Sequence, residues 1–347
     1  MFCSSALLTV VSSAICASAT RGLSLKVTGP TAVDGASNFK VITEMTNTGD
    51  EHMKLINDPR TPLSDIPTNT FHITNANNIS PDFAGARAKF VPESAIGSGR
   101  FTTLAPGESK VVEHDLSRAY DFSNSGEGAY KVQAHNLFHI INDDKLDLIY
   151  AISEGHTAQV SGPLSSASPV GHLGRRAMFR SCSANQQAQL NDAIPAAQSY
   201  ASDAFDYLTT HNTSSIPEDR YTGWFGTFDL DRHDIVAGHF KNISSDSYAS
   251  YTYDCTCSDK DTYAYVYPNT FGVIYLCGAF WEAPFTGTDS KAGTLIHENS
   301  HFLVNGGTQD HVYGQKAAST LAKDNAVQAI NNADNHEYFA ENNPKQT

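Results

Sequence analysis

The sequence predicts two domains of different class, an all-β, sandwich-like half followed by an α+β half. The hydrophobic period changes near residue 176, a linker-like segment precedes that point, and the charge changes with it. Residues 20–176 contain 14 basic and 17 acidic residues, a net of −3, whereas residues 177–347 contain 9 and 20, a net of −11. With 347 residues and 40% hydrophobic content, the chain is long enough for two cores.

The first 19 residues have the pattern of a secretory signal peptide. An apolar stretch from Ala6 to Ala17 ends in Ala17-Ser18-Ala19, a small-x-small cleavage motif, although no Lys or Arg precedes the stretch. We therefore expect a secreted, extracellular protein; the alternative is a buried N-terminal helix. No apolar run reaches the roughly 18 residues that a membrane span needs, so we expect no membrane association once the signal is removed.

Residues 23–160 alternate between apolar and polar positions and are interrupted by turn-forming residues. Half-buried strands are expected at four places: 24–28, 39–43, 110–114 and 129–133. Turns are expected at 106–108 and 126–128. Short strands at this spacing are typical of an antiparallel β-sandwich.

Residues 161–174 are rich in Ser, Gly and Pro and read as a linker. The linker ends in Arg175-Arg176, a dibasic pair of the kind that processing proteases cut. The alternative is a pair of solvated arginines. We expect cleavage here to release residues 177–347.

The second half begins with a helical period and then changes to a period of two. One apolar helix face is formed by Leu190, Ile194, Ala197, Ala201, Phe205 and Leu208, with Pro195 as a possible kink. A second helix is expected over 235–243, strands at 251–255, 263–267 and 273–277, and further helices from about residue 290. These elements predict an α+β domain.

Four cysteines remain after removal of the signal, and an even number in a secreted chain predicts two disulfides. Cys255 and Cys257 lie two residues apart on a strand-like segment, so they cannot comfortably pair with each other. Each must pair with either Cys182 or Cys277, and both connectivities remain open.

The segment His297-Glu298-Asn299-Ser300-His301 is an H-E-x-x-H motif in a predicted helix. Asp289 and Ser290 can cap the start of this helix, and residues 305–307 can end it. His297 and His301 lie on one helical face and can bind one metal ion. Glu298 is displaced around the helix by about 100°, so it can reach a water molecule beside the metal.

A catalytic zinc needs a third protein ligand and an open position. The longer metzincin motif is absent, because residues 304 and 307 are Val and Gly. Three acidic or imidazole candidates remain: Asp310, His311 and the more distant Glu337. Asp310 follows the Gly306-Gly307 turn, which can direct the chain back toward the metal.

Gly307-Thr308-Gln309-Asp310 after H-E-x-x-H resembles the G-T-x-x-D signature of the aspzincins, the deuterolysin family of fungal zinc endopeptidases. Segments 263–269, 276–281 and 332–339 are most similar to the peptidyl-Lys metalloendopeptidases of that family. The resemblance covers 182–347; the first half matches only in its role as a long propeptide. It implies an α+β zincin-like catalytic domain over 177–347, preceded by an all-β sandwich-like propeptide domain over 20–176.

The resemblance also implies roles for individual residues. His297, His301 and Asp310 bind one Zn²⁺ per chain, Glu298 is the general base, and Tyr313 helps to hold the oxyanion. Asp334 and Glu337 recognise lysine on the leaving-group side of the scissile bond. The family pairs its cysteines in sequence order, which implies Cys182–Cys255 and Cys257–Cys277.

The expected protein is thus a secreted zinc metalloendopeptidase, made as a precursor, that cleaves on the N-terminal side of lysine in protein and peptide substrates. The alternatives are a deuterolysin-like endopeptidase of broader specificity, or a secreted β-sandwich binding module joined to an inactive zincin domain. The net charge of −14 opposes binding to nucleic acid. We expect the enzyme to act as a monomer.

Overall fold

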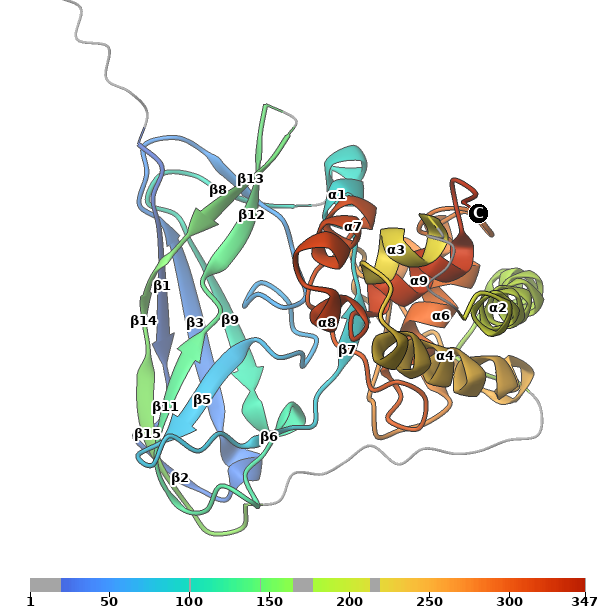
Figure 1. Cartoon of the computed structure of the whole chain (residues 1–347). Helices are drawn as coiled ribbons and strands as arrows, with labels where there is room; N and C mark the ends of the chain where they lie inside the picture. Colours follow the sequence, from blue (N-terminus) through green and yellow to red (C-terminus); the bar gives the residue numbers. More distant parts are fainter. Residues whose placement is uncertain (1–19, 100, 144, 165–176, 213–218, 347) are drawn as a thin grey trace, which may run out of the picture.

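The computed structural model describes residues 20–99, 101–143, 145–164, 177–212 and 219–346. The predicted signal peptide and Arg175-Arg176 lie outside these residues. Two large hydrophobic cores form within the described chain, one from side chains between Leu23 and Val160 and the other from side chains between Leu190 and Ala340. Smaller clusters, such as that of Ile56, Phe90 and Tyr313, join the two halves. Figure 1 shows the sheets of the first half beside the helices of the second.

The first half is built from strands. One sheet has the order β14 (Ile152–Glu154), β1 (Leu23–Thr28), β3 (Lys40–Asn47) and β9 (Ser109–Asp115). A second has the order β2 (Ala32–Asp34), β15 (His156–Ser161), β11 (Gly128–Ala134) and β5 (Phe71–Asn75). A third has the order β13 (Lys145–Tyr150), β12 (Leu137–Asn142), β4 (Met53–Leu55) and β8 (Thr102–Leu104), and β10 (Tyr120–Asp121) pairs with β6 (Asp82–Phe83).

Alternating side chains give the first half its core. Along β3, buried and exposed residues alternate, so the apolar members, such as Val41 and Met45, face inward. They join a single cluster with inward residues of the second sheet, among them Tyr130 and Val160. The four strands expected from the sequence are confirmed as β1, β3, β9 and β11.

The second half places helices around a short mixed sheet. The sheet has the order β16 (Met178–Arg180), β17 (Thr252–Asp254), β19 (Val273–Leu276), β18 (Ala264–Val266) and β7 (Arg87–Lys89). The helices are α1 (Pro92–Ser98), which follows β7, and then α2 (Ala184–Thr210), α3 (Asp219–Phe225), α4 (Leu230–Ser245), α5 (Gly278–Glu282), α6 (Lys291–His301), α7 (Gln315–Asp324), α8 (Ala326–Ala329) and α9 (Ala333–Glu341). The three strands expected here are confirmed as β17, β18 and β19.

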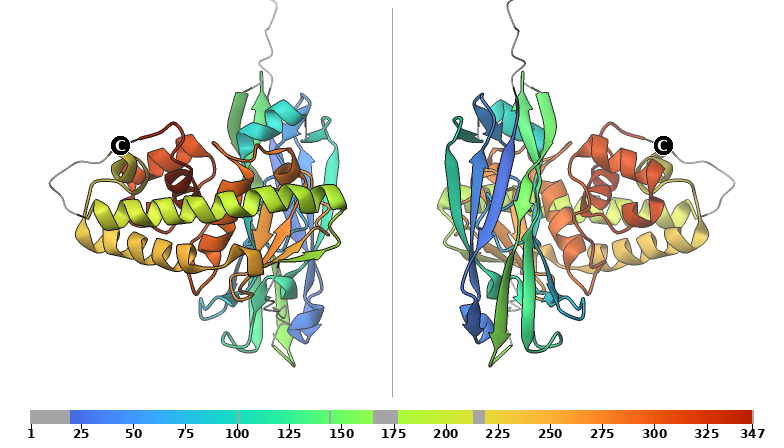
Figure 2. Two further views of the ribbon diagram at one scale, coloured as in Figure 1. Left: turned by 90° about the vertical axis from the view of Figure 1, so that its right-hand side faces the viewer. Right: turned by 90° about the vertical axis from the view of Figure 1, so that its left-hand side faces the viewer.

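Two disulfides brace this sheet. Cys182 bonds to Cys255 and Cys257 bonds to Cys277, the pairs that the family resemblance implies. Helix α2 continues through Pro195 without a break, and Figure 2 shows it running alongside α4. No helix in the described part of the chain is long and apolar enough to cross a lipid bilayer.

Strand β7 comes from the first half but completes the sheet of the second. It pairs in antiparallel register with β18, with Lys89 opposite Ala264 and Ala88 opposite Tyr265. In Figure 1 it runs between the sheets of the first half and the helices of the second. This crossing is not predictable from the sequence, because a three-residue strand has too short a pattern to recognise.

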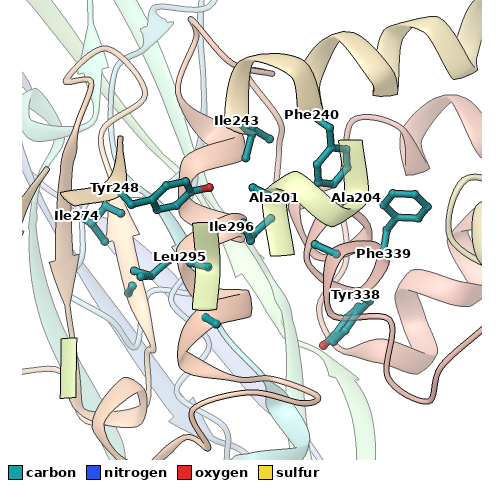
Figure 3. Packing of buried hydrophobic residues seen from close by; sticks show 14 of the residues in the cluster. Ala201, Ala204, Phe240, Ile243, Tyr248, Ile274, Leu295, Ile296, Tyr338 and Phe339 are labelled. Carbon is teal, nitrogen blue, oxygen red and sulfur yellow. The ribbon is translucent and has the colours of Figure 1, made fainter. Parts of the chain in front are cut away.

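Helix α6 is the centre of the second core. Every residue from Lys291 to His301 is buried, with α2, α4, α5 and α9 packed around the helix. In Figure 3, Leu295 points toward Ile274 and Ile296 toward Ala201. Packing on all sides fixes the rotation of the helix, and with it the direction of the H-E-x-x-H side chains.

Candidate active site

The ends of α6 are set by local hydrogen bonds. Ser290 is the N-cap residue, and its hydroxyl accepts a hydrogen bond from the Gly293 amide at 2.9 Å. The helix ends at His301, earlier than the expected end at residues 305–307. Gly307 has a φ of 58° in the turn that follows, and this turn leads the chain back toward the helix at Asp310.

Three side chains converge as the sequence predicts. The Nε2 atoms of His297 and His301 each lie 3.3 Å from Oδ1 of Asp310. Two ligands held about 2.0–2.1 Å from a tetrahedral zinc lie about 3.3 Å apart. These three atoms are buried and form no hydrogen bond with any other residue that the structure describes. The spacing and the unsatisfied atoms both fit a metal ion bound by His297, His301 and Asp310.

The second nitrogen of each histidine lies beside an oxygen atom. Nδ1 of His301 donates to the Thr308 carbonyl at 2.9 Å, and Nδ1 of His297 lies 2.8 Å from Oδ1 of Asp334. Because the Thr308 carbonyl accepts the proton at Nδ1 of His301, the lone pair of Nε2 in that ring is left facing Asp310. The carboxylate of Asp334 beside Nδ1 of His297 favours the same tautomer there. This outer contact fixes the tautomer and ring orientation that a zinc ligand needs.

Glu298 lies outside the three-residue cluster. Its side chain is fully buried and Oε1 accepts a hydrogen bond from the Lys89 amide at 3.1 Å, whereas Oε2 has no hydrogen-bond partner in the described part of the chain. Burial raises the pKa of the Glu298 carboxyl to about 8, although neighbouring His297 opposes the shift. A carboxyl with this pKa can take up and release a proton near neutral pH.

Tyr313 contacts the backbone next to Lys89, the residue whose amide donates to Glu298. Its hydroxyl donates a hydrogen bond to the Ala88 carbonyl at 2.7 Å. The ring is held between Phe90, in an edge contact at 5.9 Å, and the Arg60 guanidinium, 4.2 Å from the ring centre. Burial raises the pKa of Tyr313 well above its usual value, so the hydroxyl stays protonated and can donate.

Asp334 and Glu337, which α9 brings together, form an anionic pocket. The Nζ atom of Lys89 lies 2.7 Å from Oε2 of Glu337 and 3.5 Å from Oδ1 of Asp334. Burial alone would lower the pKa of Lys89, but Asp334 and Glu337 raise it well above its usual value, so the amine remains charged. Lys89, Asp334 and Glu337 are all fully buried.

A third carboxylate, Asp289, completes the pocket. Its Oδ1 lies 3.0 Å from Nζ of Lys89 and accepts a hydrogen bond from the Tyr338 hydroxyl at 2.6 Å. Asp289 has a φ of 53°, in the left-handed region that Asp and Asn tolerate better than most residues. From the sequence, Asp289 is expected only as a helix cap; its place immediately before the Ser290 cap is the one signal that marks it.

Comparison with known proteins agrees with this geometry. The aspzincin family model, described as lysine-specific metallo-endopeptidase, matches residues 208–341. The chain is 50% identical to a peptidyl-Lys metalloendopeptidase of Grifola frondosa over 99% of both chains, and 46% identical to one of Armillaria mellea over 96% of both. An extracellular protease of Aeromonas hydrophila is 32% identical over 97% of this chain and 96% of its own.

The similarity therefore extends through the first half as well, where the sequence analysis found only a shared role. Among solved structures, a zinc peptidase from Grifola frondosa is 54% identical and covers 48% of this chain and 100% of its own, with a TM-score of 0.47. Full-length identity to two peptidyl-Lys enzymes shows that the chain belongs to the aspzincin family and is a metalloendopeptidase of the peptidyl-Lys type.

Proposed function

We propose that the chain is a secreted zinc metalloendopeptidase, made as a precursor, that hydrolyses peptide bonds on the N-terminal side of lysine. His297, His301 and Asp310 hold one zinc ion, and their unsatisfied buried atoms support this assignment. A zinc ion bound there polarises the scissile carbonyl and lowers the pKa of a bound water molecule to about 7.

Glu298 and Tyr313 act on the two sides of the scissile bond. Glu298 takes a proton from the attacking water and later delivers it to the leaving amine, a role that fits a buried carboxyl with a pKa of about 8. The Tyr313 hydroxyl donates to the carbonyl oxygen as negative charge develops there. Their contacts with the Lys89 amide and the Ala88 carbonyl support these roles.

The buried ammonium group of Lys89 is the observation that supports specificity for lysine. Lys89 enters the pocket immediately beside Glu298, and carboxylates of Glu337 and Asp289 lie within 3.0 Å of its Nζ atom. A substrate lysine in this position places the bond on its N-terminal side against Glu298 and Tyr313. Arg is less suited to the pocket because its head is larger and planar.

Changing Glu337 to Gln removes the carboxylate nearest the lysine ammonium but keeps the size of the side chain. Loss of a charge-assisted contact of about 1.5–3 kcal/mol lowers kcat/KM for a lysine peptide by about 10- to 150-fold. The matched control is the same peptide with Met in place of Lys, for which the variant and the parent should differ little. Bound zinc is measured in parallel. An unchanged Lys-to-Met ratio in the zinc-loaded variant is incompatible with this pocket.

Substitution of Asp334 tests lysine recognition less specifically than substitution of Glu337. Its Oδ1 lies 2.8 Å from Nδ1 of His297, and its Oδ2 accepts a hydrogen bond from the Gly314 amide at 2.6 Å. Asp334→Asn is therefore expected to weaken zinc binding as well as lysine recognition, by about 10- to 100-fold for the metal.

We assign residues 1–19 to the signal peptide, 20–176 to a β-sandwich-like propeptide and 177–347 to the endopeptidase. Each half has a large core of its own, which supports this division, while strand β7 and small clusters such as that of Phe90 and Tyr313 join the two halves. The secreted, active form is expected to begin near Ala177. N-terminal sequencing of that form checks the assignment, and a start upstream of about residue 165 would reject it.

Metal removal tests the proposed activity. A chelator should abolish proteolysis by the processed enzyme, because it removes the zinc ion that the three ligands hold. Stoichiometric Zn²⁺ should restore the activity. A chain that binds zinc in the expected ratio but cleaves no protein would instead be a binding module with an inactive zincin domain.

A further inference from the structure

The segment that fills the candidate active site belongs to the chain itself. Strand β7 extends the sheet at β18 as an added antiparallel strand, and the Tyr263 amide donates a hydrogen bond to the Lys89 carbonyl at 2.9 Å. Addition of an extended peptide to a sheet edge is a common mode of peptide recognition, in which backbone hydrogen bonds set the register.

That register brings one peptide bond to the reactive groups. On one side of the Ala88–Lys89 bond, the Tyr313 hydroxyl donates to the carbonyl of Ala88; on the other, the amide of Lys89 donates to Glu298. The Ala88 amide also donates to Oδ2 of Asp310 at 3.2 Å. Three site residues thus contact a single dipeptide.

The side chain of Lys89 fixes the same register independently. It is fully buried, and its ammonium contacts Glu337, Asp289 and Asp334 in the anionic pocket. A lysine of the first half therefore occupies the place proposed for a substrate lysine. With one residue of slippage along β18, the ammonium would leave this pocket, because neighbouring strand residues point to opposite faces.

We propose that the chain is its own first substrate: the Ala88–Lys89 bond lies in the active site as the bond to be hydrolysed, and its presence there excludes other peptides. The proposal rests on the proposed function. Water adds across the bond: the C–N bond breaks, the water oxygen becomes part of a carboxylate on Ala88, and both water protons end on the nitrogen of Lys89, which leaves as an ammonium group.

Self-cleavage is tested on the full chain with Arg175→Ala and Arg176→Ala, which keep the linker uncut. After Zn²⁺ is added, sequencing should find one new N-terminus, at Lys89, at a rate that does not depend on chain concentration. Hydrolysis of an added lysine peptide should begin only as this N-terminus forms. In the Glu298→Gln background the bond should remain intact.

Lys89→Ala should prevent the cut and leave the site open. This full-length variant should hydrolyse the added lysine peptide at once, at least about tenfold faster than the uncut parent, because the charge-assisted contacts that retain the segment are gone. Lys40→Ala is the control, since Lys40 is an exposed lysine of the same half that pairs with Glu113; it should behave as the parent does.

If Lys89→Ala fails to fold, amine acylation of the Glu298→Gln chain gives a second readout. Lys89 should resist the reagent while Lys40 reacts. Ready acylation of Lys89 would overturn the proposal, as would hydrolysis of the added peptide by a chain whose Ala88–Lys89 bond is intact.

A separate preparation, with Arg175-Arg176 present and cut by a dibasic-specific protease, distinguishes failure of the self-cleavage proposal from failure of the proposed function. If that preparation hydrolyses lysine peptides but the zinc-loaded full chain never loses the Ala88–Lys89 bond, self-cleavage is wrong and the proposed function stands. If the zinc-loaded preparation cuts no lysine peptide, both fail together.

Discussion

Replacement of Glu298 by Gln should lower kcat/KM of the processed enzyme by about 10²- to 10⁴-fold, the range that a general base contributes. The amide keeps the size of the carboxylate but cannot accept a proton from water. Zinc should remain bound at one ion per chain, because Glu298 is not one of the three residues whose ligand atoms converge. Metal analysis and peptide hydrolysis on the same sample measure both quantities.

The matched control is Glu282→Gln. Glu282 ends helix α5, is exposed and lies outside the candidate site, so this variant should keep both zinc and activity. If zinc is lost together with activity in Glu298→Gln, the carboxylate supports the metal site and is not the base.

Replacement of Asp310 by Ala should remove the third ligand and lower zinc affinity by more than the roughly 10- to 100-fold that loss of an outer partner costs. Oδ1 of Asp310 is the atom that both histidines approach at 3.3 Å. Burial alone would raise the pKa of Asp310, but His301 and His297 lower it well below its usual value, so the carboxylate is available to a metal without first losing a proton. Competition with a chelator of known affinity measures the change.

Asp324→Ala provides the comparison, because Asp324 is an exposed residue at the end of α7 and should not affect the metal. Zinc affinity that is the same in Asp310→Ala and Asp324→Ala would rule out the three-ligand site.

The sequence predicted the parts of this fold that follow a local period. Burial on one side imposes the alternation of β3, and α2 shows its apolar face at Leu190, Ala197 and Ala201. The H-E-x-x-H spacing likewise fixes the direction of two side chains within a single helix. These features need no knowledge of how distant segments pack.

Contacts between distant segments were not predictable in the same way. Lys89 reaches the anionic pocket across 200 residues to Asp289 and 245 to Asp334, and no local pattern encodes such a pairing. The contact between Asp334 and His297 depends on how α9 packs against α6. The resemblance suggested that Asp334 and Glu337 belong together, but only the packed helices show that they lie beneath a candidate metal ligand.

The central claim is that a zinc-dependent site selects lysine immediately after the bond that it cuts. Digestion of a denatured protein with the processed enzyme, followed by sequencing of every new N-terminus, tests it most directly. Nearly all new N-termini should begin with lysine, and few with arginine. New N-termini that begin with lysine no more often than its abundance in the digested protein would contradict the claim.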